Sequence, residues 1–339
     1  MSSSGLSGNA DAGSVAQTTT RATANARRRL TLAVALVLAA AAPASAFPDK
    51  PLELTVLFGA GSAADLLARK LAELAGRDLG QPVTVVNRTG AGGALGYTYV
   101  KGQPADGHAL VWNSNSISTA YHAGNMKLDY TAFAGVAALT SEPVSLAVKA
   151  DAPWKDAREL LAHARANPGH VRLGNSGRGS FTHLVAVALE NRAGVKLTHV
   201  PFGRELAVTT VLGDKIEASV QLPAEIMAQV TGRQVRVLAV SGDRRLPSLP
   251  DAPTLKEAGV DLTMTLWRGV AVPKGTPETA IARLERALTQ AANGPEVRDF
   301  AARMGAVVDV RGAKDFDAFM ARDDREIAAL MEQIGLRKQ

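Results

Sequence analysis

Cysteine is absent from all 339 residues of this chain, and aromatic residues make up only 4% of it. The lack of cysteine excludes thiol catalysis, cysteine-ligated zinc and iron–sulfur clusters. No run of Lys or Arg is interleaved with aromatic residues, so we expect no nucleic-acid binding. The six histidines show no H-E-x-x-H motif and no paired ligand spacing, and the Met and aromatic residues are too scattered for a cofactor box. We therefore expect neither a metal nor a cofactor.

A hydrophobic run long enough to span a bilayer, roughly 20 residues, is also missing. The most apolar stretch, 30–42, follows three arginines and precedes Pro43-Ala44-Ser45-Ala46, which places small residues before a cut after Ala46. This is the plan of a secretory signal peptide. We predict that residues 1–46 form a disordered leader and signal peptide and that the protein is periplasmic. An uncut signal anchor is the alternative, and Sec and twin-arginine export both stay open.

The chain after Ala46 has 293 residues, which suggests two domains of roughly 150 residues each. Four of the 38 basic and one of the 32 acidic residues lie before residue 47, which leaves a net charge of +3 on the rest. The basic balance of the whole chain is thus partly a property of the leader. An exported protein of this size without cysteine needs a core large enough to fold without disulfides.

Apolar runs of strand length alternate with helical patterns through the rest of the chain, which predicts an α/β fold with parallel strand pairing. Strands are expected at 54–58, 83–86, 109–112, 144–148, 171–173, 197–200, 218–221, 235–240 and 269–272. Helices are expected at 64–79, 156–166, 183–193, 205–212, 277–292 and 313–334. The strands near 144–148 and 235–241 are the expected hinges between two lobes. Lobe 1 would comprise 47–143 plus 242–339, and lobe 2 would comprise 149–241.

A glycine turn joins the first expected strand to the first helix. It reads Gly59-Ala60-Gly61-Ser62-Ala63, and Ser62 with Asp65 three residues later fits a capping box. A helix N-terminus exposes unpaired N–H groups and the positive end of the helix dipole, so it can hold an anion with backbone alone. Dinucleotide-binding enzymes and carboxylate receptors both use such a unit.

A second glycine loop, 174–180, precedes a helix that Ser180 can cap. Ser176 and Gly177 lie in this loop, and His183 follows it, where it either faces a ligand or hydrogen-bonds near the helix start. Asn113 and Ser114 follow another apolar strand. If the lobes face each other, these loops converge on one cleft, because ligands of open α/β sheets bind at the carboxyl ends of strands. Two opposed amide nests suit a small molecule with two anionic ends.

Arg268 is a candidate cation beside an expected cleft strand, and a guanidinium fork matches a carboxylate. The alternative is a surface arginine, or one paired with an acid such as Asp261.

Two enzyme functions are alternatives to a receptor function for these motifs. Gly59–Ala64 fits the dinucleotide fingerprint, with Asn87-Arg88 near the ribose position, as in an exported NADP-dependent oxidoreductase. Export counts against this reading, because the periplasm does not recycle NADPH. A serine hydrolase with Ser176 as nucleophile needs glycine at position 178, where Arg178 stands. Asp65 reads as a capping carboxylate in preference to a catalytic one.

Several segments between residues 47 and 339 share their order and spacing with a known family. They are Phe47–Phe58, Gly59–Asp65, Leu79–Gly93, Pro104–His108, Asn167–Gly169, Gly177–Leu184, His199–Phe202, Leu249–Thr254 and Pro273–Pro277. Through these segments the chain resembles the solute-binding receptors of tripartite tricarboxylate transporters, the Bug receptors.

This resemblance implies a two-lobed periplasmic binding protein, a Venus flytrap of type II-like form, with no catalysis. It implies a small carboxylate held by backbone amides and water, with the membrane components of a tripartite transporter or a sensor kinase as partners. We expect a monomer. The sequence departs from the family's pattern at Phe58–Ser62, after Phe202, at Gln221, where Asp is frequent, and at Arg268, where an aromatic residue is common. The resemblance also reads Asn87–Gly90 as a turn, not a ribose site.

Overall fold

The computed structural model describes residues 47–202 and 207–338. The chain from Pro48 onward forms one compact unit. The expected leader 1–46 lies outside the described residues, as does the segment 203–206 in which the sequence departs from the family pattern. Cleavage after Ala46 therefore stays a prediction. Among the residues that the structure describes, no helix is long and apolar enough to cross a membrane.

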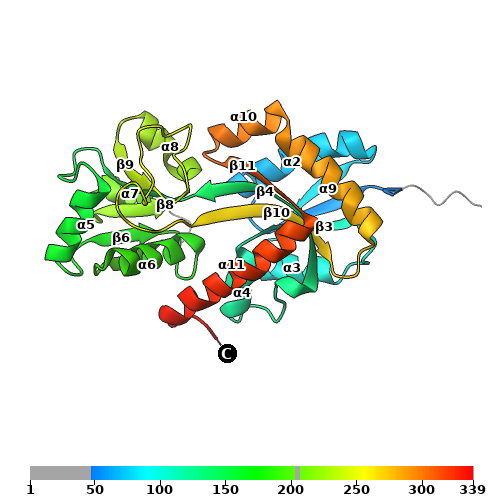
Figure 1. Cartoon of the computed structure of the whole chain (residues 1–339), viewed down its shortest axis with the longest axis horizontal. Helices are drawn as coiled ribbons and strands as arrows, with labels where there is room; N and C mark the ends of the chain where they lie inside the picture. Colours follow the sequence, from blue (N-terminus) through cyan, green and yellow to red (C-terminus); the bar gives the residue numbers. More distant parts are fainter. Residues whose placement is uncertain (1–46, 203–206, 339) are drawn as a thin grey trace, which may run out of the picture. The chain divides into compact units, whose positions relative to one another are not determined.

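Two β-sheets and the helices that cover them make up this unit (Figure 1). The strands are β1 (Leu52–Val56), β2 (Val83–Asn87), β3 (Ala109–Ser114), β4 (Phe133–Pro143), β5 (Ser145–Lys149), β6 (Arg172–Asn175), β7 (Thr198–Pro201), β8 (Ala218–Gln221), β9 (Val235–Val240), β10 (Thr265–Pro273) and β11 (Val307–Gly312). The helices are α2 (Ala63–Leu79), α3 (Ala94–Lys101), α4 (Ser116–His122), α5 (Ala157–Ala166), α6 (Phe181–Ala193), α7 (Ala207–Leu212), α8 (Pro223–Thr231), α9 (Glu278–Asn293), α10 (Pro295–Arg303), α11 (Ala313–Gln333) and the short 3-10 turns η1 (Ala91–Gly93) and η2 (Tyr130–Ala132).

The strand order is β11-β4-β10-β3-β1-β2 in the first sheet and β7-β6-β8-β5-β9 in the second. β1 is parallel to β2 and β3, and β6 is parallel to β7 and β8. The α/β class is confirmed, but the expectation of parallel pairing is wrong for β4, β5, β9, β10 and β11, whose pairings are antiparallel. Only Val144 separates β4 from β5, so the chain enters the second sheet without the crossover helix that parallel neighbours need.

Helices cover both faces of the second sheet. Val148 belongs to the apolar cluster of α5 and α6, whereas the adjacent Ala147 belongs to the cluster of Val208 in α7 and Ile226 in α8. Successive side chains of a strand point to opposite faces, so this division places one helix pair on each face.

The first sheet is covered by α3, α4 and α11, whose Tyr97, Ile117 and Phe316 pack with Val111 of β3 and Ala271 of β10. A second group comprises α2, α9 and α10, which lie side by side (Figure 1).

One helix, α11, contributes to both apolar clusters. Phe316 and Met320 near its start belong to the cluster of the first sheet, and Ile327 and Met331 near its end belong to that of the second. The boundaries of the two expected lobes stay a prediction. The segment after β9 nevertheless packs apolar side chains, Val260 among them, into the cluster of the second sheet.

Candidate functional site

The turn after β1 ends at the helix cap that the sequence predicts. The Ser62 side chain accepts a hydrogen bond from the Asp65 N–H at 3.3 Å, and Ser62 has extended backbone angles. The Asp65 carboxylate reaches back to the N–H of Gly61 at 2.9 Å. The reciprocal bond of a capping box is thus made one residue earlier than expected, and Asp65 is confirmed as a residue that holds the turn.

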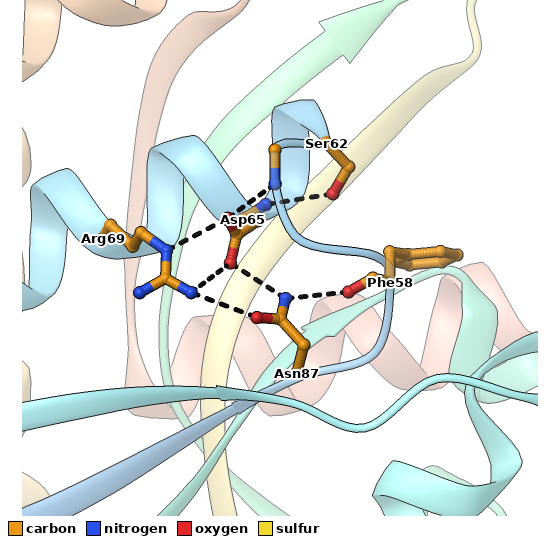
Figure 2. A network of polar contacts seen from close by, with 6 residues as sticks. Phe58, Ser62, Asp65, Arg69 and Asn87 are labelled. Atoms are coloured by element: carbon orange, nitrogen blue, oxygen red, sulfur yellow. Dashed lines mark hydrogen bonds and ion pairs between the residues drawn. The ribbon is translucent and has the colours of Figure 1, made fainter.

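The Asp65 side chain is the centre of a polar network that ties α2 to the end of β2 (Figure 2). Its Oδ1 accepts from Asn87 Nδ2 at 2.9 Å, and its Oδ2 accepts from Arg69 Nε at 3.0 Å. Asn87 Nδ2 also donates to the carbonyl of Phe58 at 2.9 Å, and Asn87 Oδ1 accepts from Arg69 at 3.1 Å. Asn87 therefore contacts the turn at Phe58 and Asp65 contacts it at Gly61, while Arg69 joins these two side chains.

Asp65 is 2% exposed, and Gly59, Ala60 and Gly61 are exposed. Burial alone raises the pKa of Asp65, but the hydrogen bonds from Arg69, Gly61 and Asn87 outweigh it and leave the pKa below its usual value. The carboxylate is thus ionised and directly paired with a guanidinium at the start of α2. This pairing opposes the repulsion that a free carboxylate would exert on an anion.

The backbone donors of this turn fall into two groups. Gly61, Ser62 and Asp65 donate to acceptors of the protein itself. Ala63 and Ala64 occupy the first two positions of α2, where an N–H has no acceptor within the helix. Ala63, at the positive end of the α2 dipole, is partly exposed and can offer its N–H to an anion, whereas Ala64 is only 2% exposed.

Arg88 is engaged by other groups of the protein. Its guanidinium contacts Glu53 at 2.9 Å and lies over the ring of Tyr99, 3.5 Å from the centroid. Asn87 is engaged by Asp65. These contacts fit the turn implied by the family resemblance, and they leave Arg88 committed to an acid and not to a ribose phosphate.

The second glycine loop uses most of its backbone donors internally. The N–H groups of Ser176, Gly177 and Ser180 donate to Thr182 Oγ1, Asn175 Oδ1 and the Gly177 carbonyl. Ser180 caps α6 as expected, since its Oγ accepts from the His183 N–H at 3.2 Å. The N–H groups of Ser176, Gly177 and Ser180 are therefore engaged by two side chains and one carbonyl of the protein itself, and ligand contact by these residues stays a prediction.

His183 lies near the helix start, in the second of its two expected roles. Its Nδ1 accepts from the Gly179 N–H at 3.0 Å, and its ring packs edge-on against His199. Burial, together with His199 and Arg178, lowers the pKa of His183 to about 4. It lines a pocket of about 490 Å³ with residues of α6, β7 and the end of α11, which does not include the turn after β1.

Three other candidates are buried inside the protein. Asn113 is fully buried and accepts from the Tyr97 hydroxyl at 2.6 Å, and Ser114 contacts the Ser116 hydroxyl at 2.8 Å. Gln221, 1% exposed, accepts from the Val208 N–H at 2.7 Å. Phe202 packs on a small apolar cluster beside the second sheet. Contact with a ligand stays a prediction for these four residues.

Arg268 is buried and paired with an acid that the sequence did not indicate. Its Nε donates to Glu142 Oε1, and its Nη2 lies 3.3 Å from Oε2. The two side chains are 5% and 3% exposed. The interpretation of Arg268 as a surface residue is wrong, and so is Asp261 as its partner, because Asp261 pairs with Lys256. Antiparallel pairing of β10 with β4, which was not predicted, brings Arg268 to Glu142.

Two further acids, Glu225 and Asp323, have raised pKa values, and the sequence analysis did not single them out. Burial raises the pKa of Glu225, which receives hydrogen bonds from the Leu222 N–H and Gln221 and interacts electrostatically with Glu142 and Arg268. Burial also raises the pKa of Asp323 to about 7. The hydrogen bonds of Glu225 are local, from residues three and four positions earlier, but those of Asp323 come from Trp267 and Asn115, which are distant in the chain. Within the described ranges, no group of three or more His, Cys, Asp or Glu side chains is placed to hold a metal ion.

Comparison with known proteins shows a consistent set of relatives. A sequence model described as the tripartite tricarboxylate transporter family receptor matches residues 67–336. A protein encoded between tcbD and tcbE in Pseudomonas sp. (strain P51) is 32% identical over 265 residues, which are 77% of this chain and 79% of that relative. Protein BugT of Bordetella pertussis is 28% identical over 300 residues, 87% of this chain and 92% of BugT.

Solved structures agree with this set. A TctC solute-binding protein from Polaromonas has a TM-score of 0.75 and 34% identity, covering 85% of this chain and 99% of that chain. MatC from Rhodopseudomonas palustris with bound malate has a TM-score of 0.70 and 27% identity, covering 84% and 99%. Another R. palustris protein, with adipate, has a TM-score of 0.73 and 25% identity, covering 85% and 98%.

Proposed function

This chain belongs to the tripartite tricarboxylate transporter receptor family, and we propose that it binds a small carboxylate, without catalysis, in a cleft between two lobes. The structural relatives that hold malate and adipate support this class of ligand. They differ in size and hydroxylation, so they support carboxylates as a class and not one member of it.

The observation that carries the proposal is the α2 N-terminus. The N–H groups of Ala63 and Ala64 are free of intrahelical partners, and the nearby Asp65 charge is paired with Arg69. We propose that one ligand carboxylate lies at this terminus, against Gly59–Ala63. Bridging water completes its hydrogen bonds, since water can connect polar groups that do not meet directly.

The second loop has a smaller role than the sequence suggests. In α6, Phe181 and Thr182 hold the first two helical positions, so their N–H groups lack an intrahelical acceptor, in contrast to the engaged amides of the preceding loop. We propose that this loop contacts the far end of the ligand through the α6 N-terminus. Arg268, already paired with Glu142, then serves the protein's stability and not ligand contact.

We further propose that the receptor works in the periplasm after cleavage behind Ala46. Family membership supports delivery of its ligand to the membrane components of a tripartite transporter. A role in sensing, with a sensor kinase as partner, is the alternative, and we propose that the receptor acts as a monomer.

A thermal-shift screen of residues 47–339 tests the ligand class. A ligand that binds only the folded protein stabilises it by RT ln(1 + [L]/Kd), about 2.7 kcal/mol at 100 times Kd. We expect malate, adipate or another mono- or dicarboxylate to raise Tm, and NADPH to leave it unchanged. The matched amides and alcohols of the same carbon skeletons are the controls. Stabilisation by NADPH, with none by any carboxylate, would reverse the choice between receptor and oxidoreductase.

A further inference from the structure

We propose that Asn87 is a positioning residue that holds the turn Phe58–Ser62 in its ligand-binding shape without contacting the ligand. The inference rests on the proposed function, because it assigns the turn to carboxylate binding. It extends that function by naming a residue outside the turn on which affinity depends.

The position of Asn87 is set by the sheet. Asn87 is the last residue of β2 and pairs in register with Val56, the last residue of β1. The N–H of the next residue, Arg88, donates to the Val56 carbonyl at 2.8 Å. The backbone beside Asn87 is therefore fixed at the point where β1 gives way to the turn. A side chain mounted on a strand is a more exact support than one carried by a loop.

The Asn87 side chain connects both ends of the turn. Its Nδ2 donates to the Phe58 carbonyl at the start and to Asp65 Oδ1 in the first turn of α2, each at 2.9 Å (Figure 2). Asp65 Oδ2 in turn accepts from the Gly61 N–H between them. A single amide thereby fixes the distance between the entry of the turn and the helix that follows it.

The network also determines which backbone donors a ligand can reach. Gly61 has a left-handed backbone with φ of 79°, and its N–H is directed to Asp65 and not to solvent. With Gly61 held in this way, the first N–H of α2 that a ligand can reach is that of the partly exposed Ala63. Binding to a turn that is already ordered costs less conformational entropy than binding to one that must be ordered.

Arg69 completes the arrangement electrostatically. It contacts both Asp65 oxygens at 3.0 Å and the Asn87 carbonyl oxygen at 3.1 Å. The network therefore supplies the turn with hydrogen bonds while the charge of Asp65 is paired behind it.

The test uses Asn87→Ala and Asn87→Asp in the chain from residue 47. Asn87→Asp is nearly isosteric but presents an oxygen where Nδ2 donates, so it removes both bonds and adds a like charge beside Asp65. Affinity is measured by calorimetry with malate or adipate, whichever stabilises the unmodified protein more. We expect about tenfold weaker binding for Asn87→Ala and a larger loss for Asn87→Asp.

A second measurement needs no ligand. Hydrogen exchange of the Gly61 amide reports directly on its bond to Asp65, and we expect exchange several-fold faster in both variants. Asn167→Ala is the matched control, because Asn167 Nδ2 also donates to a backbone carbonyl, that of His163 at 3.0 Å, at the end of α5. It should lower Tm similarly while leaving affinity and Gly61 exchange unchanged.

The outcomes separate the inference from the proposed function. Unchanged Gly61 exchange in both variants, or affinity within twofold of the unmodified protein, overturns the role of Asn87. If no carboxylate binds the unmodified protein, the proposed function fails, and Gly61 exchange still decides whether Asn87 holds the turn.

Discussion

At the scale of single residues, several charged side chains form ion pairs with other side chains of the protein. Asp65 is paired with Arg69, Arg88 with Glu53, and the buried Arg268 with Glu142. The sequence indicates the first pair, since Asp65 and Arg69 stand four residues apart on a helix. It cannot indicate the other two, because each joins residues that only strand pairing or a distant turn brings together.

Replacement of Arg268 by Ala tests whether this guanidinium supports the fold or the ligand. Both side chains of the pair are almost fully buried, and removing one partner of a buried pair costs about 3–5 kcal/mol because an unpaired charge remains. We therefore expect a loss of this size in the free energy of unfolding, measured with urea, and ligand affinity within about twofold for the fraction that stays folded.

The double variant Arg268→Met with Glu142→Leu is the control, since it removes both charges and keeps apolar volume. It should recover most of the lost stability. If Arg268→Ala instead unfolds like the unmodified protein but binds ten- to a hundred-fold more weakly, the guanidinium contacts the ligand, as a hydrogen bond to a charged group would require.

At the scale of elements, local signals located several helix caps and some of the strands, although β1 lies two residues earlier than expected. Ser62 and Ser180 cap their helices as expected, and Asp156, which was expected to be the first helical residue, caps α5. β8 and β9 have the expected bounds. The strand β4 was missed because it is rich in alanine and contains Gly135 and Pro143, which argue against a strand.

Gly269 of β10 allows the close approach of β10 to β4. A Cβ on Gly269 would lie 2.4 Å from the Ala137 carbonyl of β4, so β10 can approach β4 this closely only with glycine there. The close packing of β4 against β10 therefore depends on Gly269, which lies more than a hundred residues from β4 in the sequence. Local propensity cannot report it.

Helix α11 is the element whose contribution to stability can be tested most directly. Ile327 is fully buried and Met331 is fully buried, and both lie in the cluster shared with α6 and the second sheet. Substitution of either by Ala should lower the free energy of unfolding by about 2–4 kcal/mol, because methylene groups are lost and a cavity remains. Urea denaturation followed by circular dichroism measures the change.

The exposed Arg325 of the same helix serves as the control. Arg325→Ala should change stability by less than about 0.5 kcal/mol, as exposed substitutions away from specific contacts do. Equal effects of Ile327→Ala and Arg325→Ala would contradict the assignment of α11 to the second cluster.

At the scale of the whole molecule, the sequence predicted the class of the fold and of the function better than it predicted the site. The α/β class and the family follow from segments whose order and spacing extend along the chain. The turn after β1 and its helix cap could be predicted because their residues are contiguous in the sequence. The proposed contacts at Asn113, Ser114 and Gln221 were placed by strand ends alone, and such a placement cannot tell a cleft-facing side chain from the buried ones found here.

The stability of the whole molecule should depend on pH through groups with shifted pKa values, and Asp323 is the acid with the clearest shift. Trp267 Nε1 and Asn115 Nδ2 donate to its carboxylate, each at 2.9 Å. Burial raises its pKa to about 7, since it outweighs the lowering by the hydrogen bonds from Trp267 and Asn115, and the nearby Glu326 and Asp324 add smaller upward contributions. Between pH 4 and 7 the folded protein therefore binds more protons at this site than the unfolded chain does. Stability from Asp323 is present below pH 4 and is lost as pH rises through 7.

His183 acts in the opposite direction, because its pKa of about 4 lies below the ordinary value near 6.5. The unfolded chain binds more protons at this site between pH 6.5 and 4, so stability from His183 falls as pH is lowered through that range.

Asp323→Asn removes the pH-dependent contribution of Asp323 to stability and keeps a carbonyl oxygen that can accept from Trp267. The quantity to compare is the free energy of unfolding of Asp323→Asn minus that of the unmodified protein. We expect this difference to be about 1–3 kcal/mol more favourable to the variant at pH 8 than at pH 5. Urea unfolding at pH 5, 6, 7 and 8 measures this gain, and a difference that stays constant across the four values would show that Asp323 titrates normally in the folded protein.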